Sequence, residues 1–143
     1  MKIIIKRFDT ILSLPEYKTS GAAAFDLYAR VETVIKPKAV ALVPLNVALQ
    51  VPKDHWVLVA ARSSLHKKGL MMANGIGVGD FDYRGDNDEY HAALFNFSDK
   101  SVTVKRGERI VQAIILKREP VKFTEKKQFG TKNRGGFGST GHH

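Results

Sequence analysis

The sequence predicts an all-β fold, a jelly-roll-like distorted barrel with one short helix and a mobile, glycine-rich C-terminal arm. Two observations lead to this fold class. Short apolar segments with the spacing of β-strands recur along the 143 residues, separated by prolines and glycines. No segment carries a long apolar stripe at the helical period of about 3.6 residues. Many short strands at regular spacing are typical of a β-sandwich or barrel.

The clearest strand pattern lies at residues 43–51, where every second residue is valine or leucine. Pro44 and Asn46 are expected on the opposite face of that strand. The helix candidate is residues 63–68, because Ser63 can cap its N-terminus and Gly69 follows its C-terminus. The other predicted strands, in chain order, are residues 2–8, 31–36, 56–61, 90–97, 101–104, 109–117 and 121–124.

Length and composition fit one folded domain. Hydrophobic residues make up 43% of the chain and charged residues 26%, which is a globular composition. The absence of cysteine excludes disulfides, cysteine-ligated zinc, iron–sulfur clusters and a thiol nucleophile. The apolar runs are far shorter than the roughly 20 residues of a membrane span, and the start lacks the apolar core of a signal peptide. We therefore expect a soluble, cytoplasmic protein that does not bind membranes.

The charge is strongly positive but unevenly distributed. The formal net charge is +9, from 23 Lys and Arg against 14 Asp and Glu. Acidic residues nevertheless dominate residues 80–89, whereas basic residues dominate the segment after residue 116. A nucleic-acid binder is expected to present a continuous basic face. The distribution instead favours a site that handles a metal ion and phosphate together.

The C-terminal part of the chain has a composition of its own. We divide the chain into a barrel domain, residues 1–125, and an arm, residues 126–143. Glycines of the arm let backbone N–H groups approach an anion, Ser139 and Thr140 can donate to phosphate, and Phe137 can cover a flat base. The arm is therefore expected to be mobile alone and to order over a nucleotide. One interpretation of His142 and His143 is that they are remnants of an affinity tag.

Five segments, in this order, resemble the five motifs of the trimeric dUTP diphosphatases (dUTPases). They are residues 21–29 (GAAAFDLYA), 61–64 (ARSS), 74–85 (NGIGVGDFDYRG), 107–112 (GERIVQ) and 134–141 (RGGFGSTG). Any one segment alone is weak evidence, but five in order with family-like spacing are specific. The resemblance implies a jelly-roll-like fold and hydrolysis of dUTP to dUMP and pyrophosphate, by attack of water on the α-phosphorus. That activity limits uracil incorporation into DNA and supplies dUMP for thymidylate synthesis.

The third motif implies the nucleoside site. Asp80 matches the family's catalytic aspartate, which deprotonates the attacking water and touches the sugar 3′-hydroxyl; a carboxylate can do both because it only accepts hydrogen bonds. Tyr83 matches the tyrosine that packs beneath the deoxyribose and excludes a 2′-hydroxyl. Asn74, with backbone groups such as those of Gly77, matches the residue that bonds the uracil edge. Asp82 is expected on the opposite face of a strand, in a structural role.

The first, second and fourth motifs imply phosphate and metal binding. Arg62, Ser63 and Ser64 match the phosphate-binding motif, in which arginine offers a planar fork of donors. Gln112 matches the glutamine near the α-phosphate. The parity of Gln112 with Ile110 and Ile114 suggests a buried face, where an amide requires a partner. Asp26 matches the aspartate that holds waters of a Mg²⁺ shell, so the implied cofactor is Mg²⁺ bound mainly by the triphosphate.

The arm completes the implied site. The family's active sites each draw on three subunits, with the arm coming from the third, so the resemblance implies a homotrimer. The family's tail arginine lies five residues before the phenylalanine, where this chain has a lysine. The arm residues implied in substrate binding are Lys132, Arg134, Phe137, Gly138, Ser139 and Thr140.

Two departures concern the nucleoside site. Gly79 stands where the family usually has a branched aliphatic residue, which is expected to loosen that hairpin. Residues 86–90 look about three residues longer than the family norm, and a bulge or an extended hairpin tip is expected there.

Two other functions stay open from the sequence. The related dCTP deaminases share the fold and an Arg-Ser-Ser-like motif, but they carry a glutamate within the strand after the third motif. Here Glu89 lies only at the edge of that strand. A non-enzymatic binder of nucleic acid or protein would use the +9 charge, and the acidic residues 80–89 argue against it.

Overall fold

The computed structural model describes residues 1–142 and confirms the all-β fold class. Eleven strands and one 3₁₀ turn follow one another along the chain. The strands are β1 (Ile4–Arg7), β2 (Phe25–Tyr28), β3 (Thr33–Ile35), β4 (Val40–Pro44), β5 (Val47–Gln50), β6 (His55–Ala61), β7 (Leu70–Met72), β8 (Gly77–Gly79), β9 (His91–Asn96), β10 (Val102–Val104) and β11 (Arg109–Lys117), and the 3₁₀ turn is η1 (Leu65–Lys68).

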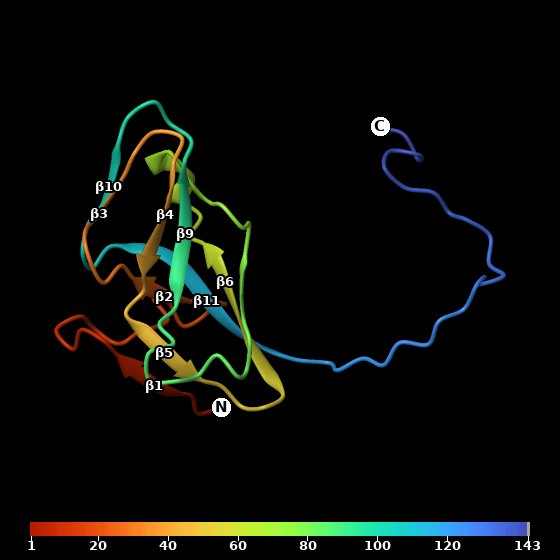
Figure 1. Ribbon diagram of the computed structural model, residues 1–143, viewed down its shortest axis with the longest axis horizontal. Helices are drawn as coiled ribbons and strands as arrows, with labels where there is room; N and C mark the ends of the chain where they lie inside the picture. Colours follow the sequence, from red (N-terminus) through yellow and green to blue (C-terminus); the bar gives the residue numbers. More distant parts are fainter. Residues whose placement is uncertain (143) are drawn as a thin grey trace.

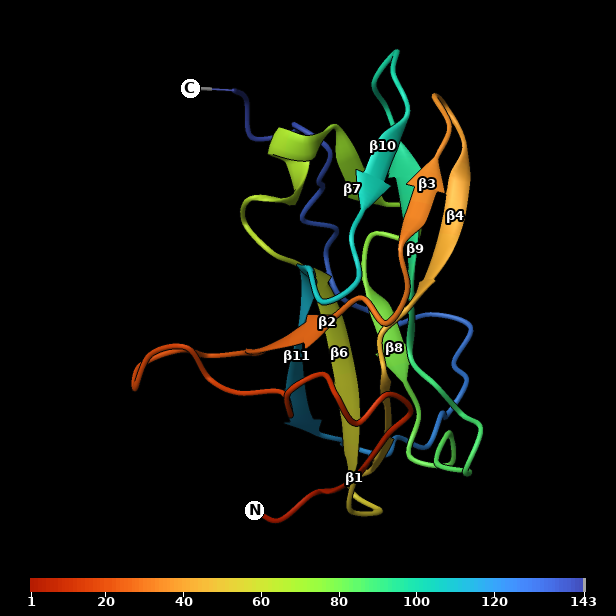
Figure 2. The same cartoon turned by 90° about the vertical axis from the view of Figure 1, so that its left-hand side faces the viewer.

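The strands form small antiparallel sheets that wrap into a barrel-like body (Figure 1). The largest sheet has the order β2-β11-β6-β8 and the second has the order β4-β9-β7. Two further pairs, β1-β5 and β3-β10, complete the body (Figure 2). Because β6 pairs with β11 on one side and β8 on the other, the large sheet connects the second, third and fourth motifs.

The apolar pattern at residues 43–51 forms two strands, where one was predicted. β4 ends at Pro44 and β5 starts at Val47, with Asn46 between them at a φ of 70°. Pro44 and Asn46 are both buried. The Asn46 amide donates to the backbone carbonyl of Asp9, at 3.0 Å, so the N-terminal segment covers this side.

Most predicted strands are confirmed to within two residues at each end, but three short ones were missed. Strands β2, β7 and β8 have three or four residues, and no period-two pattern marks them in the sequence. The strand predicted at residues 121–124 is wrong for the described chain. Val121 and Phe123 are 68% and 94% exposed there, and no strand pairs with them within residues 1–142.

The helix candidate at residues 63–68 is a single 3₁₀ turn. Gly69 ends η1 in the left-handed region, at a φ of 79°, as predicted. The prediction that Ser63 caps the turn is wrong, since Ser64 occupies the N-cap position and its side chain makes no capping hydrogen bond. The hydroxyls of Ser63 and Ser64 are exposed and are therefore accessible to a ligand.

A core of valine and leucine side chains fills the body and holds the large sheet in place. Its fully buried members include Leu27 of β2, Val57 of β6 and Val111 of β11. None of the helical segments within residues 1–142 is long and apolar enough to cross a membrane.

The C-terminal segment leaves the body and extends away from it (Figure 1). Every residue from 117 to 142 is exposed, so this segment adds nothing to the core. The division at residue 125 and the mobility of the arm stay predictions. His143 lies outside the described residues, so the tag interpretation of His142 and His143 is untested.

Candidate active site

Four residues that the third motif implicates meet at one cavity of about 300 Å³, which we call the hairpin cavity. Its wall is formed by β8, the loops on both sides of β8 and the start of β9. Asp80 follows β8 directly and is exposed, and Tyr83 follows it in the same turn, donating its backbone N–H to the Asp80 carbonyl at 3.2 Å. The lining residues are Val59, Asn74, Gly77, Val78, Gly79, Asp80, Tyr83, Glu89, Tyr90 and His91.

Two tyrosines stand edge to face in the wall of the hairpin cavity. The ring centroids of Tyr83 and Tyr90 lie 5.5 Å apart, with an interplanar angle of 81°. The Tyr83 hydroxyl donates to the backbone carbonyl of Glu89, at 2.8 Å, which fixes the ring beside the cavity. Burial, followed by the charges of Asp88 and Glu89, raises the pKa of Tyr83 above its ordinary value. Its ring is thus held in place and neutral at physiological pH.

Glu89 anchors the loop between β8 and β9 close to the start of β9. Its carboxylate accepts two hydrogen bonds from the Arg30 guanidinium, at 2.7 and 3.0 Å, and one from the Asn46 backbone N–H, at 3.0 Å. The carboxylate also raises the pKa of Arg30. With three charge-assisted or backbone donors, Glu89 acts as a structural anchor. It is not a free carboxylate such as general acid–base catalysis requires.

The loop between β8 and β9 differs from two predictions. Asp82 lies exposed in a turn, so its expected place on the opposite face of a strand is wrong. No ion pair involves Asp82 within residues 1–142. Residues 86–90 belong to no strand, and they are not the tip of a hairpin, because β8 pairs with β6 whereas β9 pairs with β4 and β7. Instead, the Asp88 carboxylate accepts a hydrogen bond from the Gly85 N–H at 2.7 Å and closes a tight turn.

A second set of predicted residues lies where β2, β11 and the end of β6 meet. We call Asp26, Arg62 and Arg109 the arginine cluster. Asp26 of β2 is only 7% exposed and makes ion pairs with Arg62 at 3.1 Å and with Arg109 at 3.0 Å. Gln112 of β11 lies opposite Asp26 in the strand register. Its amide donates to the Ala61 carbonyl at 3.0 Å, so the half-buried side chain has the partner that its position requires.

A cationic cavity of about 490 Å³ adjoins this cluster. Arg62, Ser64, Lys67 and Lys68 line it together with residues 107–110. Lys68 forms an ion pair with Glu108, which leaves Lys67 and the arginines as the main source of positive charge. This set of donors is suited to phosphate oxygens.

No cluster of carboxylate and histidine side chains within residues 1–142 could enclose a metal ion. Asp26 is the predicted metal-associated residue; its Oδ2 accepts a hydrogen bond from Arg109, and its Oδ1 forms an ion pair with Arg62. A carboxylate has about four lone-pair sites, so Asp26 retains the capacity to accept from metal-bound water. The residues are therefore compatible with a hydrated Mg²⁺ held mainly by substrate phosphates.

The two cavities share no lining residue, and the arm lines neither of them. Within the arm, backbone hydrogen bonds from Ser139 to Gly136 and from Gly141 to Gly138 form short turns, and Phe137 is fully exposed. A single chain therefore brings together Asn74, Gly77, Asp80 and Tyr83 in one place and Asp26, Arg62, Ser64 and Gln112 near another. It brings neither set to the predicted arm residues Lys132, Arg134, Phe137, Gly138, Ser139 and Thr140.

Comparison with known proteins decides the family. The family model described as dUTPase matches residues 11–141. The chain belongs to the dUTPase family. It is 39% identical over 145 residues to the deoxyuridine 5′-triphosphate nucleotidohydrolase of Hydrogenobaculum sp., covering 99% of both chains. It is also 39% identical to the enzyme of that name from Helicobacter pylori strain J99, covering 99% of this chain and 97% of the relative.

Solved structures agree with this assignment of the dUTPase family. A dUTPase from Streptococcus mutans superposes with a TM-score of 0.76 at 30% identity, covering 83% of this chain and 98% of the other. A dUTPase of Staphylococcus bacteriophage 80alpha, solved with dUPNHPP, superposes with a TM-score of 0.85 over 99% of both chains. At 20% identity, that second likeness shows the fold alone.

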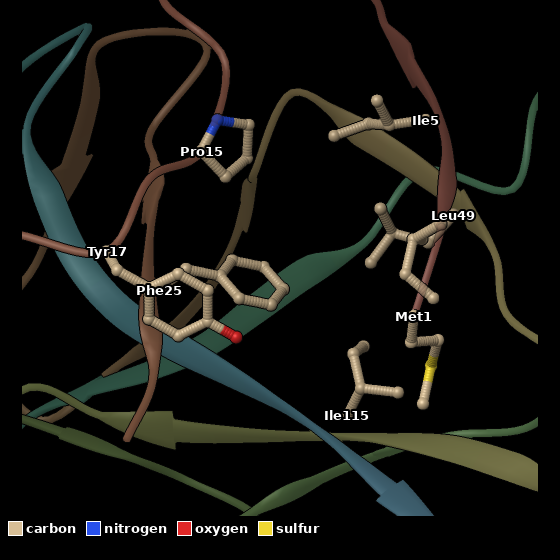
Figure 3. A pocket seen from close by; sticks show the side chains of 8 residues that line it. Met1, Ile5, Pro15, Tyr17, Phe25, Leu49 and Ile115 are labelled. Carbon is tan, nitrogen blue, oxygen red and sulfur yellow. The ribbon is translucent and has the colours of Figure 1, made fainter. Parts of the chain in front are cut away.

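A further cavity of this dUTPase-family chain is lined by apolar side chains and by no predicted site residue. It has a volume of about 400 Å³ and lies between the N-terminal segment, β2, β5 and β11. Figure 3 shows the side chains of Met1, Ile5, Tyr17, Phe25 and Ile115 around it.

Sequence reasoning missed two residues of these sites. Arg109 lies within the fourth motif, and its opposite charge to Asp26 was the available signal; the pairing became visible only when β11 was placed beside β2. Tyr90 was assigned to a strand, yet its ring lines the hairpin cavity. No feature of the sequence distinguishes Tyr90 from an ordinary strand tyrosine.

Proposed function

We propose that this chain hydrolyses dUTP to dUMP and pyrophosphate by attack of water on the α-phosphorus. The observation that carries the proposal is the hairpin cavity, where the predicted base, sugar-binding and catalytic residues of the third motif meet. Membership of the dUTPase family and full-length similarity to deoxyuridine triphosphate nucleotidohydrolases support the same reaction.

In this proposal the nucleoside occupies the hairpin cavity. Asn74 and the backbone of Gly77 bond the uracil edge, and the Tyr83 ring packs beneath the deoxyribose, leaving no room for a 2′-hydroxyl. Asp80 orients the water and accepts its proton. The position of Asp80 suits this role because its carboxylate is exposed at the cavity and makes no ion pair within residues 1–142.

The phosphates extend from the cavity toward cationic and hydroxyl groups. Arg62, Ser63, Ser64 and Gln112 bind phosphate oxygens, and the arm supplies further donors from Ser139, Thr140 and the backbone of Gly138. Phe137 stacks on the uracil, and Lys132 or Arg134 replaces the family's tail arginine. Charge on the phosphate oxygens is then stabilised by these donors.

Mg²⁺ is the proposed cofactor, and Asp26 is the proposed holder of its water shell. When bound, the ion supplies positive charge to the triphosphate. The ion pairs of Asp26 with Arg62 and Arg109 hold the carboxylate in a constant position.

A homotrimer with three shared sites is the proposed assembly. Its support within this chain is the separation of the hairpin cavity from the arginine cluster and the extension of the arm away from both. Additional copies would bring the three sets of residues together. Size-exclusion chromatography with light scattering should give three times the 15.9 kDa chain mass, and a monomer with full activity would contradict the assembly.

We further propose a cytoplasmic location, where the reaction limits uracil incorporation into DNA and supplies dUMP. The central test is incubation with dUTP, dCTP, dTTP and UTP, with and without Mg²⁺, followed by identification of products. Pyrophosphate and dUMP from dUTP alone are the expected result. Ammonia released from dCTP would support the deaminase, and salt-dependent DNA binding without any hydrolysis would support a non-enzymatic role.

A further inference from the structure

Tyr90 carries a buried hydroxyl with no partner. The residue is only 5% exposed, and its hydroxyl oxygen makes no hydrogen bond within residues 1–142. Leaving a buried hydroxyl unpaired costs about 1–3 kcal/mol, so such a group requires an explanation. The ring of Tyr90 lines the hairpin cavity, which places this unpaired donor in the wall of the proposed nucleoside site.

Gly79 is the residue that makes room for this hydroxyl. A Cβ atom built on Gly79 would lie 2.6 Å from Cε1 and 2.8 Å from Cζ of Tyr90, and closer still to the hydroxyl oxygen. Any other residue at position 79 would displace the tyrosine. The Tyr90 side chain thus occupies the space that the missing side chain leaves, and the expectation that Gly79 loosens the hairpin stays a prediction.

The polar neighbours of Tyr90 are already engaged with one another. The Tyr83 hydroxyl and the His91 Nδ1 both contact the Glu89 carbonyl, at 2.8 Å each. The Glu89 carboxylate is bound by Arg30. Asp80 lines the same cavity, and its negative charge acts on Tyr90. Within the described chain the Tyr90 hydroxyl thus has no hydrogen-bond partner of its own.

We propose that Tyr90 is a further specificity residue whose hydroxyl donates a hydrogen bond to the 3′-hydroxyl oxygen of the bound deoxyribose. The inference rests on the proposed function. A sugar hydroxyl has one proton to give and two lone pairs to fill. Asp80 can only accept, so it takes the proton of the 3′-hydroxyl, and Tyr90 supplies the donor that Asp80 cannot.

The state of the Tyr90 side chain suits this task. Burial, followed by the charges of Tyr83 and Asp80, raises its pKa to about 12, so the phenol keeps its proton at neutral pH. The hydroxyl lies behind Gly79, in the wall of the cavity. Contact with the sugar therefore involves a small shift of Gly79 and Asp80.

The test is a double-mutant-type cycle, which removes the Tyr90 hydroxyl from the protein and the 3′-hydroxyl from the substrate, separately and together. Wild type and Tyr90→Phe are assayed on dUTP and on 2′,3′-dideoxyuridine triphosphate, which lacks the 3′-hydroxyl. On dUTP we expect Tyr90→Phe to lower kcat/KM by about three- to tenfold, the net value of one neutral hydrogen bond. On the dideoxy substrate we expect wild type and Tyr90→Phe to be equal.

Tyr83→Phe is the matched control, since it removes a neighbouring hydroxyl that is bonded to the Glu89 carbonyl. Its effect should be the same on both substrates. The melting temperature of Tyr90→Phe should be unchanged or higher, because the variant removes an unpaired buried polar atom. An equal loss on both substrates, or no loss on dUTP, would overturn the proposal.

Failure of the inference is distinguishable from failure of the proposed function. If wild type does not hydrolyse dUTP, the proposed function is wrong, and the inference that rests on it is overturned as well. If wild type is active and Tyr90→Phe shows no dependence on the 3′-hydroxyl, only the role of Tyr90 is wrong.

Discussion

The hairpin cavity and the C-terminal arm both offer aromatic rings and polar groups to a ligand, but the body fixes only those of the cavity in place. Around the cavity, Tyr83, Glu89 and Tyr90 are fixed by hydrogen bonds and by packing against the body. In the arm, Phe137 and the residues around it are exposed, and backbone hydrogen bonds join them into short turns. A preformed pocket can select a nucleoside, whereas an unanchored arm must lose conformational entropy to bind.

This difference separates the variants that should affect chemistry or folding from those that should affect only binding. Changes in the hairpin cavity act on positioned groups, so they alter turnover or stability. Changes in the arm remove contacts that form only with ligand, so stability should not respond.

The largest effect should come from Asp80→Asn. An amide cannot accept the proton of the attacking water, so kcat should fall by roughly 10²–10⁴-fold, the usual contribution of a positioned general base. Steady-state kinetics on dUTP measures this fall. Asp82→Asn is the matched control, because Asp82 lies exposed in the same turn but does not line the cavity, and its kcat should be unchanged. Equal turnover in Asp80→Asn and wild type would remove Asp80 from catalysis.

Phe137→Ala should weaken binding without affecting the fold. Stacking of an aromatic ring on a base contributes about 1–3 kcal/mol, so KM for dUTP should rise roughly ten- to a hundredfold. Phe129→Ala is the control, since Phe129 is 89% exposed in the same arm but lies outside the fifth motif. Both variants should have the same melting temperature as the wild-type protein. A lower melting temperature for Phe137→Ala would show that the ring packs on the body.

Gly79→Ala should destabilise the hairpin cavity. The added methyl group overlaps the Tyr90 side chain, and overpacking of this kind costs about 1–3 kcal/mol in the free energy of unfolding. Urea denaturation measures the loss. Tyr90→Leu in the same chain should restore part of it by removing the overlapping ring atoms. Gly21→Ala, where no atom lies within 4 Å, serves as the control; an equal cost there would refute the packing argument.

The smallest effect concerns alkaline pH. Burial raises the pKa of Tyr90 to about 12, whereas an unfolded tyrosine titrates near pH 10. Above about pH 10 the unfolded state loses this proton while the folded state keeps it, so the free energy of unfolding falls as pH rises, by about 1.4 kcal/mol per pH unit. The difference between wild type and Tyr90→Phe should be constant below pH 9 and change above pH 10. A constant difference throughout would show that the hydroxyl is not buried in solution.

The failures of strand prediction have a common cause. β11 was predicted at its exact bounds because nine residues carry enough apolar pattern to stand out. β8 has three residues, two of them glycine, and exists only because β6 pairs with it. The segment at residues 121–124 shows the reverse case, an apolar pattern that finds no partner strand within the described chain.

The sequence by itself determined the fold class and the family resemblance, and it supplied the residues proposed for the chemistry, such as Asp80, Arg62 and Phe137. These depend on residue type and local spacing, which a linear chain displays directly. Tertiary structure alone decided that Asp26 lies between two arginines and that the Tyr90 hydroxyl occupies the space left by Gly79. Those contacts join residues that are distant in the chain or in neighbouring strands, so they depend on strand register and packing, which local patterns do not encode.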